Sequence, residues 1–127
     1  MQINRVVILL LTVLVISGCN TLASAINAKG TGPYRVYERS YDKVWDTVGE
    51  TVSTVGLDVV TADKDKGMLL AQRSASFFSY GENVAIFVEK IGRGRVRVEI
   101  NSKKQMETNV FAPDWSDRLF SYLDVSL

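Results

Sequence analysis

The sequence predicts an α+β fold, a two-layer sandwich of an antiparallel sheet with two helices on one face, in the element order β-α-β-β-β-β-α. Three observations predict it. Apolar residues recur at helical spacing after Ser40, segments in the middle of the chain alternate apolar and polar residues, and a second capped helical pattern closes the chain. The chain has 127 residues, the size of one domain.

The first strand and the first helix of this fold lie between residues 34 and 56. YRVYER, residues 34–39, has the short alternation of a strand. Ser40 is suited to be the N-cap of the following helix, and Asp42 is favourable in its first turn. Gly56 is suited to end the helix in a left-handed conformation. The apolar stripe of this helix consists of Tyr41, Val44, Trp45, Val48, Val52 and Val55.

Four strands are expected next. LDVVTA (57–62) and MLLAQRS (68–74) are joined by the polar turn DKDKG and form a hairpin. ENVAIFVEK (82–90) follows, and the turn IGRGR leads into RVRVEINSK (95–103), whose strict alternation is typical of a strand with one buried face. The buried face of this last strand is expected to consist of Val96, Val98 and Ile100.

A second helix is predicted within APDWSDRLFSYLD, residues 112–124. Asp114 is suited to cap it, and Asp117 follows three residues later, in the position of a capping box. Its core-facing residues are expected to be Trp115, Leu119, Phe120 and Leu123.

Residues 1–18 have the features of a secretory signal peptide. Twelve of these 18 residues are hydrophobic, and Arg5 is the only charged one. The apolar run from Val6 to Ile16 is interrupted only by Thr12. It is too short for a comfortable transmembrane helix, which needs about 20 residues. A basic start, a short apolar run and small residues before the cleavage point are typical of an exported protein.

The segment Ile16-Ser17-Gly18-Cys19 resembles the lipobox of bacterial lipoproteins, an aliphatic residue and two small ones before a cysteine. The resemblance implies cleavage before Cys19, lipidation of its thiol and acylation of the new amino terminus. Two or more acyl chains give stable membrane anchoring. An ordinary signal peptide with a chance cysteine, or an uncleaved anchor, is the alternative.

The residue after the lipidated cysteine predicts the destination. In enterobacteria-like sorting, aspartate at that position retains a lipoprotein in the inner membrane, whereas this chain has Asn20. The resemblance therefore implies the periplasmic face of the outer membrane, or the cell membrane if the organism has no outer membrane.

Residues 19–33 are interpreted as the lipidated cysteine and a flexible tether, which divides the chain into a signal peptide (1–18), this tether and an α+β domain (34–127). NTLASAINAKGTGP, residues 20–33, is small, polar and interrupted by glycine and proline. Such a tether has an r.m.s. reach of roughly 20 Å.

The residue types argue against an enzyme and against a resident cofactor other than a covalent lipid on Cys19. There is no histidine, which removes the usual general base and the commonest metal ligand, and the single cysteine is assigned to lipidation, which removes a nucleophilic thiol and thiolate zinc sites. DKDK lacks the ligand series of a calcium loop. GRG joins two strands and so is not a phosphate loop, which precedes a helix. Without residues 1–18 the charges balance, which gives no indication of nucleic-acid binding.

Two features are candidate partner-binding sites. Phe77, Phe78 and Tyr80 lie between two strands and could anchor a protein partner, enter the membrane interface, or simply cover the sheet edge. Arg95 and Arg97 lie on the outer face of the last strand with Glu99, Asn101 and Lys103, and Phe87 of the neighbouring strand could join them. This outer face is expected to be a solvated surface, with a docking surface for protein or polysaccharide as the alternative.

Residues 34–71 resemble the small helix-grip domains of the third lipoprotein subunit of the outer-membrane β-barrel assembly machinery and of related periplasmic lipoproteins of Gram-negative bacteria. The resemblance consists of a strand, a capped helix with Trp45 and a hairpin with an Asp-Lys-Gly turn. These motifs are structural and bring no catalytic residues, and the leading hypothesis is a non-catalytic interaction module, an acylated lipoprotein whose α+β domain docks an envelope protein. The alternative is a carrier that holds a small apolar ligand or lipid between helices and sheet.

Overall fold

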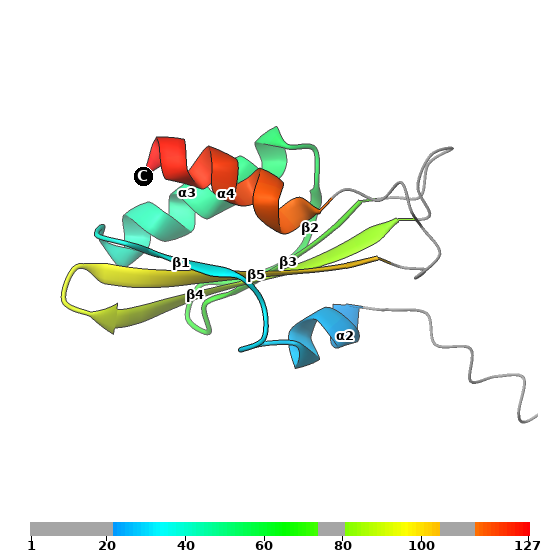
Figure 1. The fold of residues 1–127 in the computed structure, drawn as a ribbon, viewed down its shortest axis with the longest axis horizontal. Coiled ribbons are helices and arrows are strands. Elements are labelled where there is room, and N and C mark those ends of the chain that lie inside the picture. Colours follow the sequence, from blue (N-terminus) through cyan, green and yellow to red (C-terminus); the bar gives the residue numbers. More distant parts are fainter. Residues whose placement is uncertain (1–21, 74–80, 105–113) are drawn as a thin grey trace, which may run out of the picture.

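A computed structural model describes residues 22–73, 81–104 and 114–127, and they form a five-stranded antiparallel sheet with helices on both faces (Figure 1). The α+β prediction is confirmed, and from residue 34 onward the elements follow the expected order. The strands lie side by side in the order β1-β5-β4-β3-β2. The element bounds are α2 Leu22–Asn27, β1 Tyr34–Tyr37, α3 Tyr41–Thr54, β2 Asp58–Asp63, β3 Met68–Arg73, β4 Glu82–Gly92, β5 Arg95–Lys104 and α4 Trp115–Ser126.

The long helices α3 and α4 lie on one face of the sheet and begin where their caps predict. The Ser40 hydroxyl accepts a hydrogen bond from the Lys43 N–H at 3.2 Å. The Asp114 carboxylate accepts one from the Ser116 N–H at 2.9 Å. Gly56, with φ of +86°, follows the end of α3 in the left-handed region. The predicted caps therefore fix the first turns of both helices.

The core lies between these two helices and the sheet, and apolar side chains fill it. The helices contribute their apolar stripes, and β3, β4 and β5 contribute alternate residues. The buried side chains include Val44, Val48, Val52, Leu69, Val84, Ile86, Val88, Val96, Val98, Ile100, Trp115, Leu119, Phe120 and Leu123.

Register decides which residues of β4 and β5 reach this core. Ile86 lies opposite Ile100 on the helix face. Phe87 lies opposite Glu99 one step along, so these two side chains point to the other face. The edge strand β2 carries a bulge between Val59 and Thr61.

The second face of the sheet is covered by α2, which corrects the prediction of a flexible tether over residues 20–33. Ala25 is fully buried against Leu70, Ala85 and Phe87, and α2 lies beneath β4 and β5 on the side away from α3 and α4 (Figure 1). The prediction is wrong for residues 22–33 because the outward face of the sheet is itself partly apolar and needs a cover. Within the described ranges, no helix has the length and apolar character needed to span a membrane.

Candidate interaction surfaces

A buried carboxylate on the second face of the sheet holds the segment that follows α2. The Glu99 side chain is 0% exposed. Its Oε1 accepts hydrogen bonds from the Gly30 N–H at 2.6 Å and from the Asn101 amide at 2.9 Å. The Gly32 N–H donates a longer one, at 3.3 Å. We call this group of residues the Glu99 latch, because it connects β5 to residues 30–32.

The second oxygen of the same carboxylate faces an arginine. Arg97 Nη1 lies 3.0 Å from Glu99 Oε2, an ion pair without hydrogen-bond geometry. The guanidinium also lies 4.3 Å from the centre of the Tyr34 ring. Burial raises the pKa of Glu99, but the hydrogen bonds from Asn101, Gly30 and Gly32, and then the contact with Arg97, outweigh burial and hold that pKa below its usual range.

Gly32 is required by close packing at the latch. A Cβ on this residue would collide with the side-chain oxygen of Asn101, and it would lie 3.0 Å from the Ile100 carbonyl oxygen. The main chain can therefore approach β5 only if residue 32 has no side chain. With the carboxylate enclosed and engaged in this way, the latch has a structural role and offers no access to a substrate.

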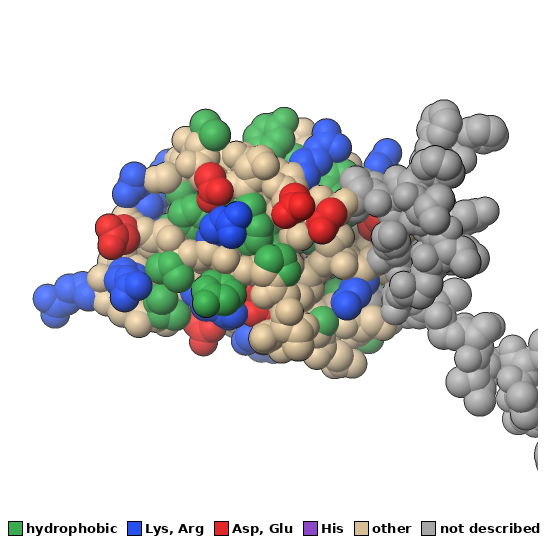
Figure 2. All heavy atoms as spheres, viewed as in Figure 1, with side chains coloured by type: hydrophobic (Ala, Val, Ile, Leu, Met, Phe, Trp, Pro, Cys, Tyr) green, Lys and Arg blue, Asp and Glu red, His purple; other side chains and the backbone are tan. Residues whose placement is uncertain are grey.

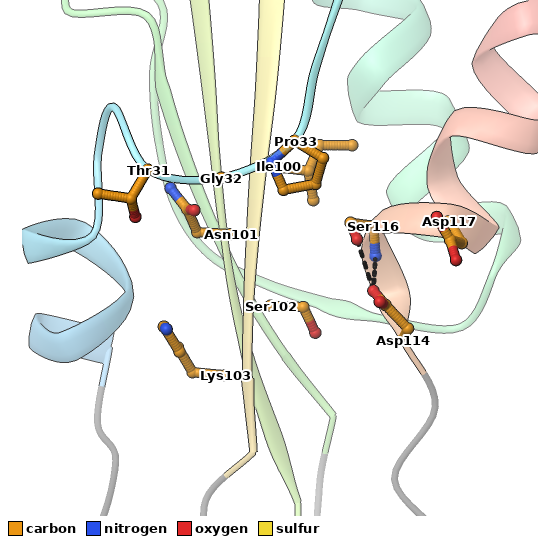
Figure 3. Close-up of a pocket in the computed structure, with 10 residues that line it drawn as sticks. All are labelled: Thr31, Gly32, Pro33, Ile100, Asn101, Ser102, Lys103, Asp114, Ser116 and Asp117. Atoms are coloured by element: carbon orange, nitrogen blue, oxygen red, sulfur yellow. Dashed lines mark hydrogen bonds between the residues drawn. The ribbon is translucent and has the colours of Figure 1, made fainter.

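A cleft lies beside the latch, at the start of α4 (Figure 3). Its volume is about 600 Å³, and its wall comes from residues 31–33, from β5 and from the first turn of α4. Ser102 points toward α4, whereas Asn101 and Lys103 point toward α2 (Figure 3). Asp114 accepts hydrogen bonds from both the N–H and the hydroxyl of Ser116. Of the two carboxylates that line the cleft, Asp114 and Asp117, the first is thus occupied as a helix cap.

Nothing in the described ranges forms a metal centre, since no group of three or more histidine, cysteine, aspartate or glutamate side chains could hold an ion there.

The prediction that the outer face of β5 is a solvated surface is wrong for residues 97–101. Glu99 and Asn101 are buried, Arg97 is half-buried in the latch, and Phe87 is buried beneath α2. The physical reason is that residues 22–33 cover this face. Arg95 alone is exposed, at the turn between β4 and β5.

The remaining predicted site residues lie outside the described chain. Cys19, Phe77, Phe78 and Tyr80 belong to ranges that the structure does not describe. Lipidation of Cys19 and the role of the three aromatic residues stay predictions.

A further surface was missed in the sequence. Arg39, Lys90, Arg93 and Arg95 line a cleft of about 300 Å³ between the β4–β5 turn and the start of α3. The sequence contains the arginines, two in GRGR (residues 92–95) and Arg39 just before the first long helix. No local pattern indicates that Arg39 lies beside the turn.

No family model and no curated protein matches the chain. Solved structures do match it. Among them is the crystal structure of the adenylate sensor from AMP-activated protein kinase in complex with 5-aminoimidazole-4-carboxamide 1-beta-D-ribofuranotide, with a TM-score of 0.52 and 7% sequence identity. The match covers 72% of this chain and 92% of that one. At this identity the likeness shows the fold alone.

Proposed function

We propose that this protein is a membrane-anchored periplasmic lipoprotein whose α+β domain is a non-catalytic module that docks another envelope protein. The single observation that carries the proposal is the sequence Ile16-Ser17-Gly18-Cys19 at the end of an eleven-residue apolar run. Asn20 favours the periplasmic face of the outer membrane as its destination, or the cell membrane in an organism without an outer membrane.

The position of α2 limits how far the domain would lie from an anchor at Cys19. Leu22 is the first residue of α2, and three Cα–Cα steps separate it from Cys19, so the two Cα atoms lie at most about 11 Å apart. From Leu22 onward the chain is packed on the sheet and held by the Glu99 latch. A lipid on Cys19 would therefore hold the domain directly at the membrane surface.

The filled core favours docking over the carrier alternative. A carrier needs a dry cavity between helices and sheet. In the described chain that space is occupied by interlocking side chains such as Ile86, Ile100 and Trp115, each at most 1% exposed. The clefts that the structure has are lined largely by charged and polar residues at the surface. Such a surface suits recognition of a partner better than storage of an apolar molecule.

The proposal is tested first by the intact mass of the full chain purified from membranes of a Gram-negative host. We expect a chain that begins at Cys19 and carries a diacylglyceryl group and an amide-linked acyl chain. Cys19→Ser, the matched control, should keep its signal peptide and lack the lipid. A wild-type chain that retains residues 1–18, or that starts elsewhere without lipid, would overturn the lipoprotein assignment.

Docking is tested on the same acylated protein by cross-linking in intact cells. We expect a partner at near-equal amount that is lost when Phe77, Phe78 and Tyr80 are changed together to serine. A chain that purifies alone with a bound lipid or small molecule would support the carrier instead.

A further inference from the structure

Four basic side chains surround one cleft at the end of the sheet where β4 turns into β5. Arg93 and Arg95 come from the turn and the start of β5, Lys90 from the end of β4, and Arg39 from the residue before the α3 cap. All four are exposed, and no aspartate or glutamate lines the cleft. We call this site the turn cleft.

The three arginines of the turn cleft form no ion pair within the described residues, whereas Lys90 lies close enough to the Asp42 carboxylate to help lower its pKa. The ion pairs of the described residues use Arg35, Lys64, Lys66 and Arg97, and none uses a cation of the turn cleft. Arg39 donates a hydrogen bond to the Glu38 carbonyl at 2.8 Å, and the Lys90 ammonium lies 5.4 Å from the Tyr41 ring. Neither contact removes positive charge, so the turn cleft attracts anions.

The start of α3 adds to this field. Ser40 and Tyr41 line the turn cleft, and Tyr41 and Asp42 precede the first intrahelical hydrogen bond, which Val44 N–H donates to the Ser40 carbonyl at 3.1 Å. Backbone N–H groups at a helix start carry partial positive charge and bind anions. The Asp42 carboxylate opposes this effect, but it pairs with Lys64 at 2.9 Å, outside the turn cleft.

The turn cleft lies far from the point where the chain enters α2. The β4–β5 turn is at one end of the long axis of the molecule, whereas α2 begins at its side farther from that turn (Figure 1). Figure 2 shows basic side chains gathered at the end with this turn, with an acidic side chain among them. If Cys19 is the anchor, the domain is attached close to the start of α2, and the turn cleft lies at the end of the domain away from that attachment (Figure 1).

We propose that the turn cleft binds the carboxylates of an acidic segment of a protein partner. The choice of a protein over a membrane rests on the proposed function, because an anchor at Cys19 would attach the domain at a point remote from the cleft. Charge-assisted hydrogen bonds from the three arginines supply the affinity, and Tyr41 supplies an apolar contact beside them.

The test uses the full acylated chain in zwitterionic detergent micelles and a fluorescein-labelled, glutamate-rich peptide as the probe. We expect binding that weakens with added salt and that shifts the amide NMR signals of Ser40 and of residues 92–95. The triple variant Arg39→Gln, Arg93→Gln, Arg95→Gln should raise the dissociation constant by about tenfold or more. The three residues are exposed, so the fold should persist, which circular dichroism checks.

A matched control removes the same charge elsewhere. Lys43→Gln, Lys66→Gln and Arg118→Gln also take away three exposed cations, none of which lines the turn cleft. This control should bind the peptide within about twofold of the wild type, whereas an effect of net charge alone would weaken both variants equally and would overturn the proposal.

The other outcomes separate this inference from the lipoprotein assignment. If the wild type, with Cys19 acylated, does not bind the peptide, the proposed binding at the turn cleft is overturned and the lipoprotein assignment stands. A response to phosphatidylglycerol in the micelles that the triple variant loses, without peptide binding, assigns the cleft to lipid headgroups and also overturns the proposal. Peptide binding that the triple variant loses supports it, whatever the mass of Cys19 shows.

Discussion

Glu99 Oε1 accepts a hydrogen bond from the Gly30 N–H at 2.6 Å, although the two residues are 69 positions apart in the chain. Through this contact the segment ahead of the first strand becomes part of the folded domain. This contact depends on the charged state of Glu99 and on the absence of a side chain at Gly32.

Replacing Glu99 should measure the strength of the latch. Glu99→Gln keeps the shape but removes the charge that Arg97, Asn101 and two backbone N–H groups stabilise. We expect the free energy of unfolding, measured in urea, to fall by about 2 kcal/mol. The exposed Glu50 on α3 is the control, and Glu50→Gln should change stability by less than about 0.5 kcal/mol. Equal losses at both positions would contradict the latch.

The pH dependence of stability should show the contribution of the ionised Glu99 carboxylate. Because the pKa of Glu99 is lower in the folded chain than its ordinary value of 4.5, the unfolded chain takes up the proton first. The contribution of Glu99 to the free energy of unfolding is therefore complete above about pH 4.5 and is lost as pH falls through the pKa of Glu99 in the folded chain. The stability gap between wild type and Glu99→Gln should narrow in this acid range. A gap that stays constant down to acid unfolding would contradict the lowered pKa.

Two glycine-to-alanine substitutions should have opposite signs. A Cβ at Gly32 collides with Asn101, so Gly32→Ala should cost about 1–3 kcal/mol through overpacking. A Cβ at Gly49, inside α3, meets nothing within 4 Å, so Gly49→Ala should raise stability by about 0.5–1 kcal/mol. Thermal or urea unfolding of both variants checks the pair. Stabilisation by Gly32→Ala would show that residues 30–32 do not approach β5 closely.

Removal of the Tyr37 hydroxyl, which connects β1 to α4, should lower stability. That group donates a hydrogen bond to Asp124 Oδ1 at 2.7 Å, and Tyr37→Phe should cost about 1 kcal/mol. Burial, then the hydrogen bond to Asp124, raises the pKa of Tyr37 in the folded chain. Its contribution is therefore complete below about pH 10 and is lost as pH rises above that value. The exposed Tyr122 provides the comparison, since Tyr122→Phe should change the free energy of unfolding by less than about 0.5 kcal/mol.

The regular elements of this fold were predictable because their signals are local. The stripe of α3 from Tyr41 and the caps Ser40 and Asp114 each lie within a few residues, and the observed α3 ends one residue before the predicted Val55. The alternation in β5 placed Val96, Val98 and Ile100 in the core, as found.

The latch and the turn cleft were not predictable because their signals are distant. The alternation of β5 predicts Glu99 as a surface residue, and it is buried only because residues 22–33 cover that face of the sheet. LASAIN has neither an acidic first turn nor a basic last turn, and its six residues form a helix through contact with Ala85 and Phe87. Arg39 reaches the β4–β5 turn only through the pairing of β1 with β5.

The route from α2 into the sheet has a mechanical consequence. A pull on the amino-terminal end of α2 is transmitted to β5 at the Glu99 latch before it reaches β1, because Gly30 precedes Tyr34 in the chain. β5 is an interior strand, hydrogen-bonded to β1 on one side and β4 on the other. The load is thus spread over the middle of the sheet instead of peeling the four-residue edge strand β1 away one hydrogen bond at a time.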